Sequence, residues 1–300
     1  METTDKEKIR ESVRNRYGKI AQSDRLTPEI NSPTSCCSTE PLQQVLPAAS
    51  CCGTQPPDLK HESSCCGNDD FSIEKMAAYM GNLGYSKEDL ANVPDGANMM
   101  LGCGNPVALA SMKPGETVVD LGSGGGFDCF LAAKEVGETG RVIGVDMTPD
   151  MISKARKNVE KIQAKNVEFR LGEIEYLPIA DNTADIIMSN CVINLSPDKM
   201  SVYQDAFRVL KPGGRLAISD VVATAPLPDE VKSNLALIGA CIGGAATIED
   251  TEEMLKQAGF TDISITPHDK SREIIREWDP KNKKAGDYVV SANIAAKKPF

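Results

Sequence analysis

Apolar residues recur at helical spacing on either side of a polar, cysteine-bearing stretch in the first third of this 300-residue chain. Near the N-terminus, Ile9, Val13 and Ile20 share one side of a predicted helix over residues 5–22. Between about residues 27 and 68, proline, serine and glutamine dominate and large apolar side chains are sparse. Such a composition cannot bury a core, so we predict a mobile segment there.

From residue 116 onward, short apolar runs alternate with helical patterns. The predicted strands lie at 117–122, 141–147, 167–172, 184–190, 213–222, 262–268 and 287–299. The predicted helices lie at 127–136, directly after Thr148, and at 198–210, 229–239 and 250–258. Alternation of this kind is typical of a parallel sheet with helices on both faces, so we predict an α/β fold.

A glycine-rich turn follows the first predicted strand. Gly122, Gly124 and Gly126 lie in VVDLGSGGGFD, between that strand and the next helix. Glycines at such a turn let the backbone approach a ligand that rests on the helix N-terminus. Asp146 ends the second predicted strand, where an acid can hold a ribose hydroxyl. The pattern predicts a nucleotide-like ligand, and a tight turn that binds nothing is the alternative.

Two residues around this turn narrow the class of ligand. The dinucleotide-binding pattern has a glycine where this chain has Phe127, and the acidic Asp120 stands two residues before Gly122. A carboxylate repels a pyrophosphate but attracts an ammonium group. S-adenosylmethionine has an ammonium group and no phosphate, so it is the ligand that these residues favour.

The run from 117 to 223 resembles the class I S-adenosylmethionine-dependent methyltransferases. The resemblance implies a Rossmann-like, seven-stranded sheet in which the glycine loop cradles the methionine part and the acid after the second strand holds the ribose. It also implies that Glu173 and Ile174, in GEIEYLP, border the adenine and that Met147 stacks beside it. We add Asn190, at the end of the fourth predicted strand, to the cofactor-binding set. A solvated loop acid is the alternative reading of Glu173.

Three cysteines stand out by their position. Cys191 directly follows the fourth predicted strand, and ligands of open α/β sheets bind at the carboxyl ends of the strands. Cys103, in LGCGNP, and Cys241, in GACIGGA, lie in glycine-rich loops of the kind that permit close backbone approach. Cys129 lies within a predicted helix, so we interpret it as a packing residue.

Three thiolates that converge near a sulfonium methyl group would suit a soft, trivalent centre. Zinc normally takes four ligands in a closed site. Arsenic(III) held by three sulfurs keeps a lone pair, which is the nucleophile that methyl transfer requires, and it has no proton for a general base to remove. We therefore expect arsenic as the substrate and no metal cofactor.

Four segments carry a closer resemblance: SNCVINLSPDK, GACIGGA, GCG and VRNRYGKIA are similar to the arsenite methyltransferases, and the similarity covers nearly the whole chain. The resemblance implies that Cys103, Cys191 and Cys241 bind arsenic(III) and take part in catalysis. It also implies a further N-terminal cysteine that exchanges disulfides. Of three vicinal cysteine pairs we favour Cys36 or Cys37, nearest the first helix, with a metal-scavenging tail as the alternative.

Composition bears on partners and location. The net charge of −10 argues against broad contact with nucleic acid or an anionic membrane, which need a basic surface. The first twenty residues are charged throughout and carry no apolar signal core, so we expect a cytoplasmic protein. Disulfides are rare in that compartment, and the ten cysteines therefore suggest metal binding or redox chemistry, with thioredoxin or glutathione as the reductant.

We expect the chain to divide into four parts. They are an N-terminal helix (1–26), a cysteine-rich linker (27–70), an S-adenosylmethionine-binding core (71–225) and an arsenic-binding lid with the last strands (226–300). The predicted function is transfer of methyl groups from S-adenosylmethionine to arsenite. Two alternatives stay open: a methyltransferase that acts on another small molecule, and a metalloid-binding protein without catalytic activity.

Overall fold

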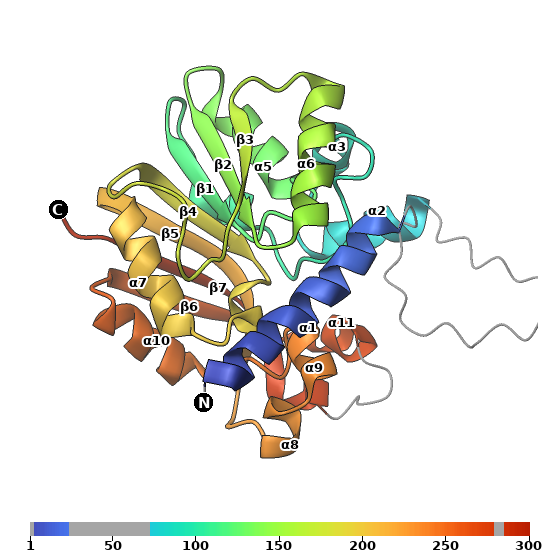
Figure 1. The fold of residues 1–300 in the computed structure, drawn as a ribbon, viewed down its shortest axis with the longest axis vertical. Coiled ribbons are helices and arrows are strands. Elements are labelled where there is room, and N and C mark those ends of the chain that lie inside the picture. The colour runs from blue at the N-terminus through green and yellow to red at the C-terminus, as the bar shows by residue number, and fades with distance from the viewer. Residues whose placement is uncertain (1–2, 24–72, 279–284) are drawn as a thin grey trace, which may run out of the picture.

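The computed structural model describes residues 3–23, 73–278 and 285–300 (Figure 1). The predicted linker, with Cys36, Cys37 and the other two cysteine pairs, lies outside the described residues. Over the described ranges, no helix combines the length and the apolar character needed to cross a bilayer.

A single seven-stranded sheet organises the chain, in the order β3-β2-β1-β4-β5-β7-β6. Its strands are β1 (Thr117–Leu121), β2 (Arg141–Asp146), β3 (Val167–Leu171), β4 (Ala184–Asn190), β5 (Leu210–Ala223), β6 (Thr261–His268) and β7 (Val289–Lys297). The α/β prediction is confirmed, and β1 to β5 pair in parallel as expected. The last strand differs, because the chain returns from β6 to insert β7 between β5 and β6, antiparallel to both.

Helices cover both faces of the sheet. Successive side chains of a strand point to opposite faces, so neighbouring apolar residues pack against different helical layers. Val118 and Met188 face a cluster that includes residues of α4 (Pro106–Ala110), α5 (Phe127–Val136) and α6 (Pro149–Ile162). The neighbouring Val119 and Ile187 face the other cluster, which includes residues of α7 (Lys199–Val209) and α10 (Ile248–Gln257). In Figure 1, α7 and α10 lie along the same side of the sheet.

The strand order reverses between β1 and β4, and this reversal fixes where a ligand can bind. From β1 the sheet continues through β2 to β3 on one side and through β4 to β5 on the other. The connections at the carboxyl ends of β1 and β4 therefore diverge and leave a crevice between them. The glycine turn and Cys191 follow these two strands, so both lie at this edge.

Several segments cover the carboxyl edge. The long α1 (Thr3–Gln22) crosses in front of it in Figure 1 and packs against α6 and α9. The remaining helices are α2 (Ile73–Asn82), α3 (Lys87–Ala91), α8 (Asp229–Lys232), α9 (Leu235–Gly239) and α11 (Ser271–Trp278), with short 3-10 turns η1 (Ile193–Leu195) and η2 (Ala285–Tyr288). A separate apolar cluster joins α1 to α9, α11 and the end of η1, and it includes Cys103, Cys191 and Cys241.

The structure changes some expected boundaries. The helix predicted over 229–239 is two short helices, because Asn234 caps α9 by accepting hydrogen bonds from the backbone of its first turn. The strand predicted over 213–222 begins earlier, because the LKPGG segment at 210–214 is already part of β5, where the pairing with β4 shifts register. Thr148 stands at the N-cap of α6 as expected, but its side chain makes no capping hydrogen bond.

Candidate functional site

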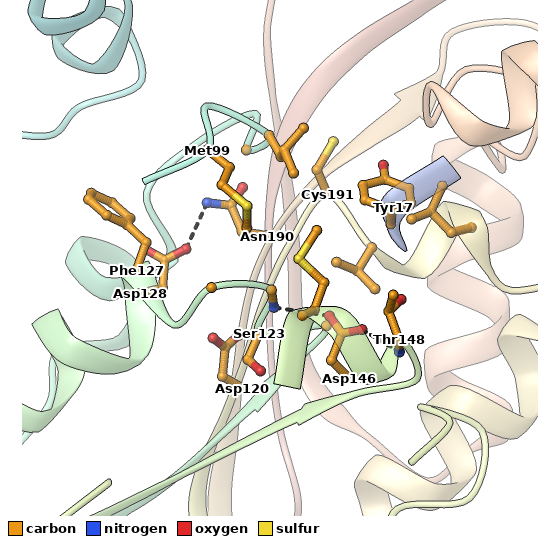
Figure 2. Close-up of a pocket in the computed structure, with 18 of the residues that line it drawn as sticks. Tyr17, Met99, Asp120, Ser123, Phe127, Asp128, Asp146, Thr148, Asn190 and Cys191 are labelled. Atoms are coloured by element: carbon orange, nitrogen blue, oxygen red, sulfur yellow. Dashed lines mark hydrogen bonds between the residues drawn. The ribbon is translucent and has the colours of Figure 1, made fainter. Parts of the chain in front are cut away.

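One cavity joins the glycine turn to Cys191 at the carboxyl edge of the sheet (Figure 2). Its walls come from the ends of β1, β2 and β4, from residues 97–102 and from α1. Figure 2 shows Asp120, Ser123 and Asp146 on one side of this space and Cys191 and Tyr17 on another. The glycine turn and Cys191 therefore share one cavity.

The glycine turn makes close backbone contacts. Gly122 has φ of +69°, and a Cβ there would lie 2.5 Å from Val192 Cγ1, on the residue after Cys191. Gly124 also lines the cavity and donates its N–H to Asp146 Oδ2 at 3.0 Å. Gly126 instead packs away from the cavity, where a Cβ would lie 2.6 Å from Phe169 Cζ. Two of the three predicted glycines thus border the space and the third permits packing of α5.

Asp146 stands where the sequence predicts a ribose ligand. Its Oδ1 accepts the Thr148 N–H at 2.8 Å, and two backbone donors thus fix the carboxylate. Burial raises its pKa, and these donors oppose the rise. Met147 and Ile174 line the cavity beside it.

Glu173 is not among the described residues that line the cavity, whereas Glu175, two positions further on, does line it. The Glu173 carboxylate faces α1, 3.4 Å from Arg10 Nε and 3.5 Å from Arg14 Nη2. Its predicted contact with adenine stays a prediction.

A buried acid pair lies next to the glycine turn. Asp128 accepts a hydrogen bond from Tyr85 Oη at 2.6 Å and one from Asn190 Nδ2 at 3.0 Å. Asp120 accepts one from the thiol of Cys129 at 3.1 Å. Burial raises the pKa of Asp128 to about 6, and burial, followed by repulsion from Asp128, raises the pKa of Asp120. Two desolvated carboxylates of this kind would be stabilised by a cationic group in the cavity.

Three buried polar atoms in the described structure have no hydrogen-bond partner, and all three belong to residues that line this cavity. They are Ser123 Oγ, Asn98 Nδ2 and Arg10 Nε. An unsatisfied buried polar group costs about 1–3 kcal/mol, so such groups are normally paired. Arg10 Nε faces the Glu173 carboxylate as an ion pair, so Ser123 Oγ and Asn98 Nδ2 are the two atoms that indicate a polar ligand.

The three predicted cysteines converge beside the part of the cavity that Cys191 lines. The side chains of Cys103, Cys191 and Cys241 are each at most 4% exposed. The Cys191 side chain is in hydrogen-bonding contact with both of the others. The Cys241 thiol also donates to the Cys191 carbonyl oxygen at 2.9 Å, and the Cys103 thiol to that of Ser219 at 3.5 Å. Three segments far apart in sequence thus meet in one cluster, which we call the thiol cluster.

Glycines explain how these segments approach. A Cβ on Gly102 would lie 2.6 Å from Asn190 Nδ2, and one on Gly104 would lie 2.8 Å from Ser219, so the GCG triplet packs onto the end of β4 and the adjacent part of β5. A Cβ on Gly244 would overlap the carbonyl oxygen of Asn194, so the GACIGGA loop lies directly against η1.

The backbone at two of the cysteines is left-handed. Cys191 has φ of +60° and Cys241 has φ of +61°, which is uncommon for residues other than glycine. Such conformations cost about 1–3 kcal/mol and persist only where the surroundings impose them. Burial raises the pKa of the Cys103 thiol to about 11, so it is protonated at neutral pH in the absence of a ligand.

Sequence reasoning missed four residues of this site: Asp128, Tyr85, Tyr17 and Asp220. Asp220 lies in the thiol cluster, and burial raises its pKa to about 6. An acid inside the apolar strand LAISDVV was the available signal. Cys129, interpreted as a packing residue, is fully buried in α5, and its thiol also contacts Asp120.

Comparisons with known proteins agree with this geometry. A family model described as a methyltransferase domain matches residues 112–259. The chain is 50% identical over 295 residues to an arsenite methyltransferase of Halobacterium salinarum, covering 98% of this chain and 68% of the relative. It is 41% identical over 188 residues to an arsenite methyltransferase of Mus musculus, covering 59% of this chain and 49% of the relative.

A solved structure is similar as well. It is an arsenic(III) S-adenosylmethionine methyltransferase from Chlamydomonas reinhardtii, with a TM-score of 0.54 and 33% sequence identity. The match covers 74% of this chain and 73% of that one.

Proposed function

This chain belongs to the arsenite methyltransferase family, and on that premise we propose that it transfers methyl groups from S-adenosylmethionine to arsenic(III) held by Cys103, Cys191 and Cys241. The observation that supports the substrate most directly is the convergence of three buried thiols, one of which, Cys191, lines the cavity. Two thiols would be common to many folds, whereas three around one point match the coordination of trivalent arsenic.

The described residues fit S-adenosylmethionine. The acid pair Asp120 and Asp128 would hold its ammonium group, and Asp146 would hold the ribose between Met147 and the glycine turn. The unpartnered Ser123 Oγ and Asn98 Nδ2 offer further polar contacts at this end. When bound, the cofactor supplies an electrophilic methyl group on a sulfonium.

The thiol cluster would perform the other half of the reaction. Three thiols replace the hydroxyls of arsenite and release three waters, so the buried sulfurs lose their protons without net proton release. Arsenic then donates its lone pair to the methyl carbon while the carbon–sulfur bond of the donor breaks. The cluster contributes by orienting the nucleophile, which converts a bimolecular encounter into an intramolecular step.

Methyl transfer oxidises arsenic to the pentavalent state. Two thiols can return it to the trivalent state by giving up two electrons and forming a disulfide. In this proposal the N-terminal cysteines, Cys36 or Cys37 among them, supply thiols for that step, and thioredoxin or glutathione reduces the disulfide. The segment 226–300 would serve as the arsenic-binding lid, since it carries Cys241, and 71–225 as the cofactor-binding core.

Replacing single cysteines tests the proposal. Cys191→Ser should reduce arsenite methylation, followed by mass spectrometry of the products, to background, while calorimetric binding of S-adenosylmethionine stays unchanged. The matched control is Cys129→Ala, which removes an equally buried thiol outside the cluster and should leave arsenite binding intact. Full activity after Cys→Ser replacement of all three would instead favour a methyltransferase of another small molecule. Absence of S-adenosylmethionine binding would favour a metalloid-binding protein without catalysis.

A further inference from the structure

A buried carboxylate within the thiol cluster has no role in the proposed reaction. A carboxylate oxygen of Asp220, Cys103 Sγ and Cys191 Sγ all lie within 4.8 Å of one another. Asp220 is 2% exposed, and in the described part of the chain it forms no ion pair. The third thiol, of Cys241, is in hydrogen-bonding contact with Cys191. Two sulfurs and one carboxylate oxygen are thus gathered around one point, and the third sulfur is next to Cys191.

Hydrogen bonds leave part of this carboxylate available. Oδ1 accepts from Asn194 Nδ2 at 2.9 Å and from the Val221 N–H at 2.7 Å. Among the described residues, the Ile193 N–H is the single donor to Oδ2, at 2.9 Å. Each carboxylate oxygen can accept two hydrogen bonds, so Oδ2 keeps a lone pair. The three donors also fix the orientation of the group, as contacts of this kind do for metal ligands.

The donor set suits a class of ion different from arsenic. Arsenic(III) takes the three sulfurs and leaves the carboxylate unused, whereas zinc and similar ions favour four ligands in a closed tetrahedron. We propose that Cys103, Cys191, Cys241 and Asp220 also form a binding site for a thiophilic divalent cation such as Zn²⁺ or Cd²⁺, which competes with arsenite. The site uses the thiol cluster of the proposed function but requires no methyl transfer.

The charges around the cluster favour such a complex. Three thiolates, one carboxylate and one divalent cation carry a net charge of −2, and the three thiol protons pass to solvent. Lys199 interacts favourably with both Asp220 and Cys241, and Arg16 of α1 interacts favourably with Cys241. Glu175 and Asp198 also face Lys199. An arsenic complex of three thiolates is neutral, so it gains less from these two cations.

Cobalt(II) provides a probe, because its visible spectrum reports tetrahedral geometry and thiolate ligation. The six N-terminal cysteines would bind the same ions, so the full-length chain is used with each of them replaced by serine. We expect one tightly bound Co²⁺ per chain, a tetrahedral thiolate spectrum, and displacement by either Zn²⁺ or arsenite. Asp220→Asn should weaken Co²⁺ binding by at least about tenfold, the loss typical of a damaged metal site, while arsenite binding changes little.

Glu175→Gln is the matched control. It removes the same charge from a buried acid that faces Lys199 but lies outside the thiol cluster, so Co²⁺ affinity should not change. Three results would overturn the proposal. The first is that no tetrahedral Co²⁺ complex forms, and the second is that the Asp220→Asn protein keeps the Co²⁺ affinity of the protein with Asp220. The third is that Asp220→Asn weakens Co²⁺ binding and arsenite binding equally, because Asp220 would then only support the η1 loop. Co²⁺ binding without arsenite binding would refute the proposed function alone.

Discussion

The two ends of the cavity are built in different ways. The acids and the glycine turn of the cofactor end come from consecutive elements, β1, the turn, α5 and β2, and Tyr85, Asn98 and Asn190 join them from other segments. The thiol cluster comes from three separate segments that follow β4, precede α4 and follow α9. The first end depends on local backbone geometry, whereas the second depends on long-range packing.

This difference shows in the conformations that each end tolerates. In the glycine turn, the left-handed positions are Gly122, Gly124 and Gly126, for which that conformation has little cost. In the thiol cluster two cysteines, Cys191 and Cys241, adopt it instead. The thiol cluster therefore holds strain that its neighbours must offset, and we expect it to be the more easily disrupted end.

Gly244→Ala should disrupt the thiol cluster and spare the cofactor end. Its new Cβ would overlap the backbone oxygen of Asn194, which cannot move aside as a flexible side chain can. Overpacking of this kind costs about 1–3 kcal/mol. We expect arsenite affinity to fall by about tenfold to 100-fold in calorimetric titration, with S-adenosylmethionine affinity unchanged.

Gly81→Ala is the matched control, because a Cβ at Gly81 in α2 meets nothing within 4 Å. It should change neither affinity. Equal loss of both ligands in the Gly244→Ala protein would show that the two ends do not fold independently, contrary to the comparison.

At the cofactor end, the sensitive feature is charge. The ammonium group of S-adenosylmethionine needs an ionised acid pair, and burial raises the pKa of Asp128 to about 6. As pH falls below about 6, Asp128 takes up a proton, and cofactor affinity should fall by about tenfold per pH unit. The stability of the unliganded protein changes with pH in the opposite direction. A buried acid with a raised pKa makes the fold less stable as pH rises from about 4 through 6.

Asp128→Asn should weaken cofactor binding at pH 7.5. It should also make cofactor affinity depend less on pH between pH 5 and 7. The second effect follows because the charge of Asp128 contributes to the raised pKa of Asp120, which would ionise more readily without it. Glu88→Gln, on the exposed face of α3, removes one charge as a control. An unchanged pH profile for Asp128→Asn would contradict the role of the acid pair.

The same division decides what could be predicted from the sequence. The strands, the glycine turn and Asp146 follow from local patterns, and the structure places them as expected. The cysteines could be singled out by their glycine-rich surroundings and by resemblance. Their left-handed backbone and the insertion of Asp220 among them could not, because both arise from contacts between β4, β5 and the loop after α9.

Glu173 and Tyr17 show the limit at the level of single side chains. Both lie in recognised motifs, but their positions depend on how α1 packs across the edge of the sheet. The arginines of α1 hold Glu173 outside the cavity, while Tyr17 of the same helix lines it. No pattern within one segment specifies this arrangement.

Tyr17 offers the mildest test, because it lies where the two ends meet. Its ring stands beside Cys191 in Figure 2, and its hydroxyl donates to the Gly239 carbonyl oxygen at 3.2 Å, two residues before Cys241. Tyr17→Phe removes this bond and keeps the ring, at a cost of about 1 kcal/mol. Arsenite affinity should fall by about fivefold and cofactor affinity should not change.

Tyr176→Phe, on an exposed tyrosine, is the control. If cofactor affinity fell and arsenite affinity did not, α1 would support the cofactor end and not the thiol cluster.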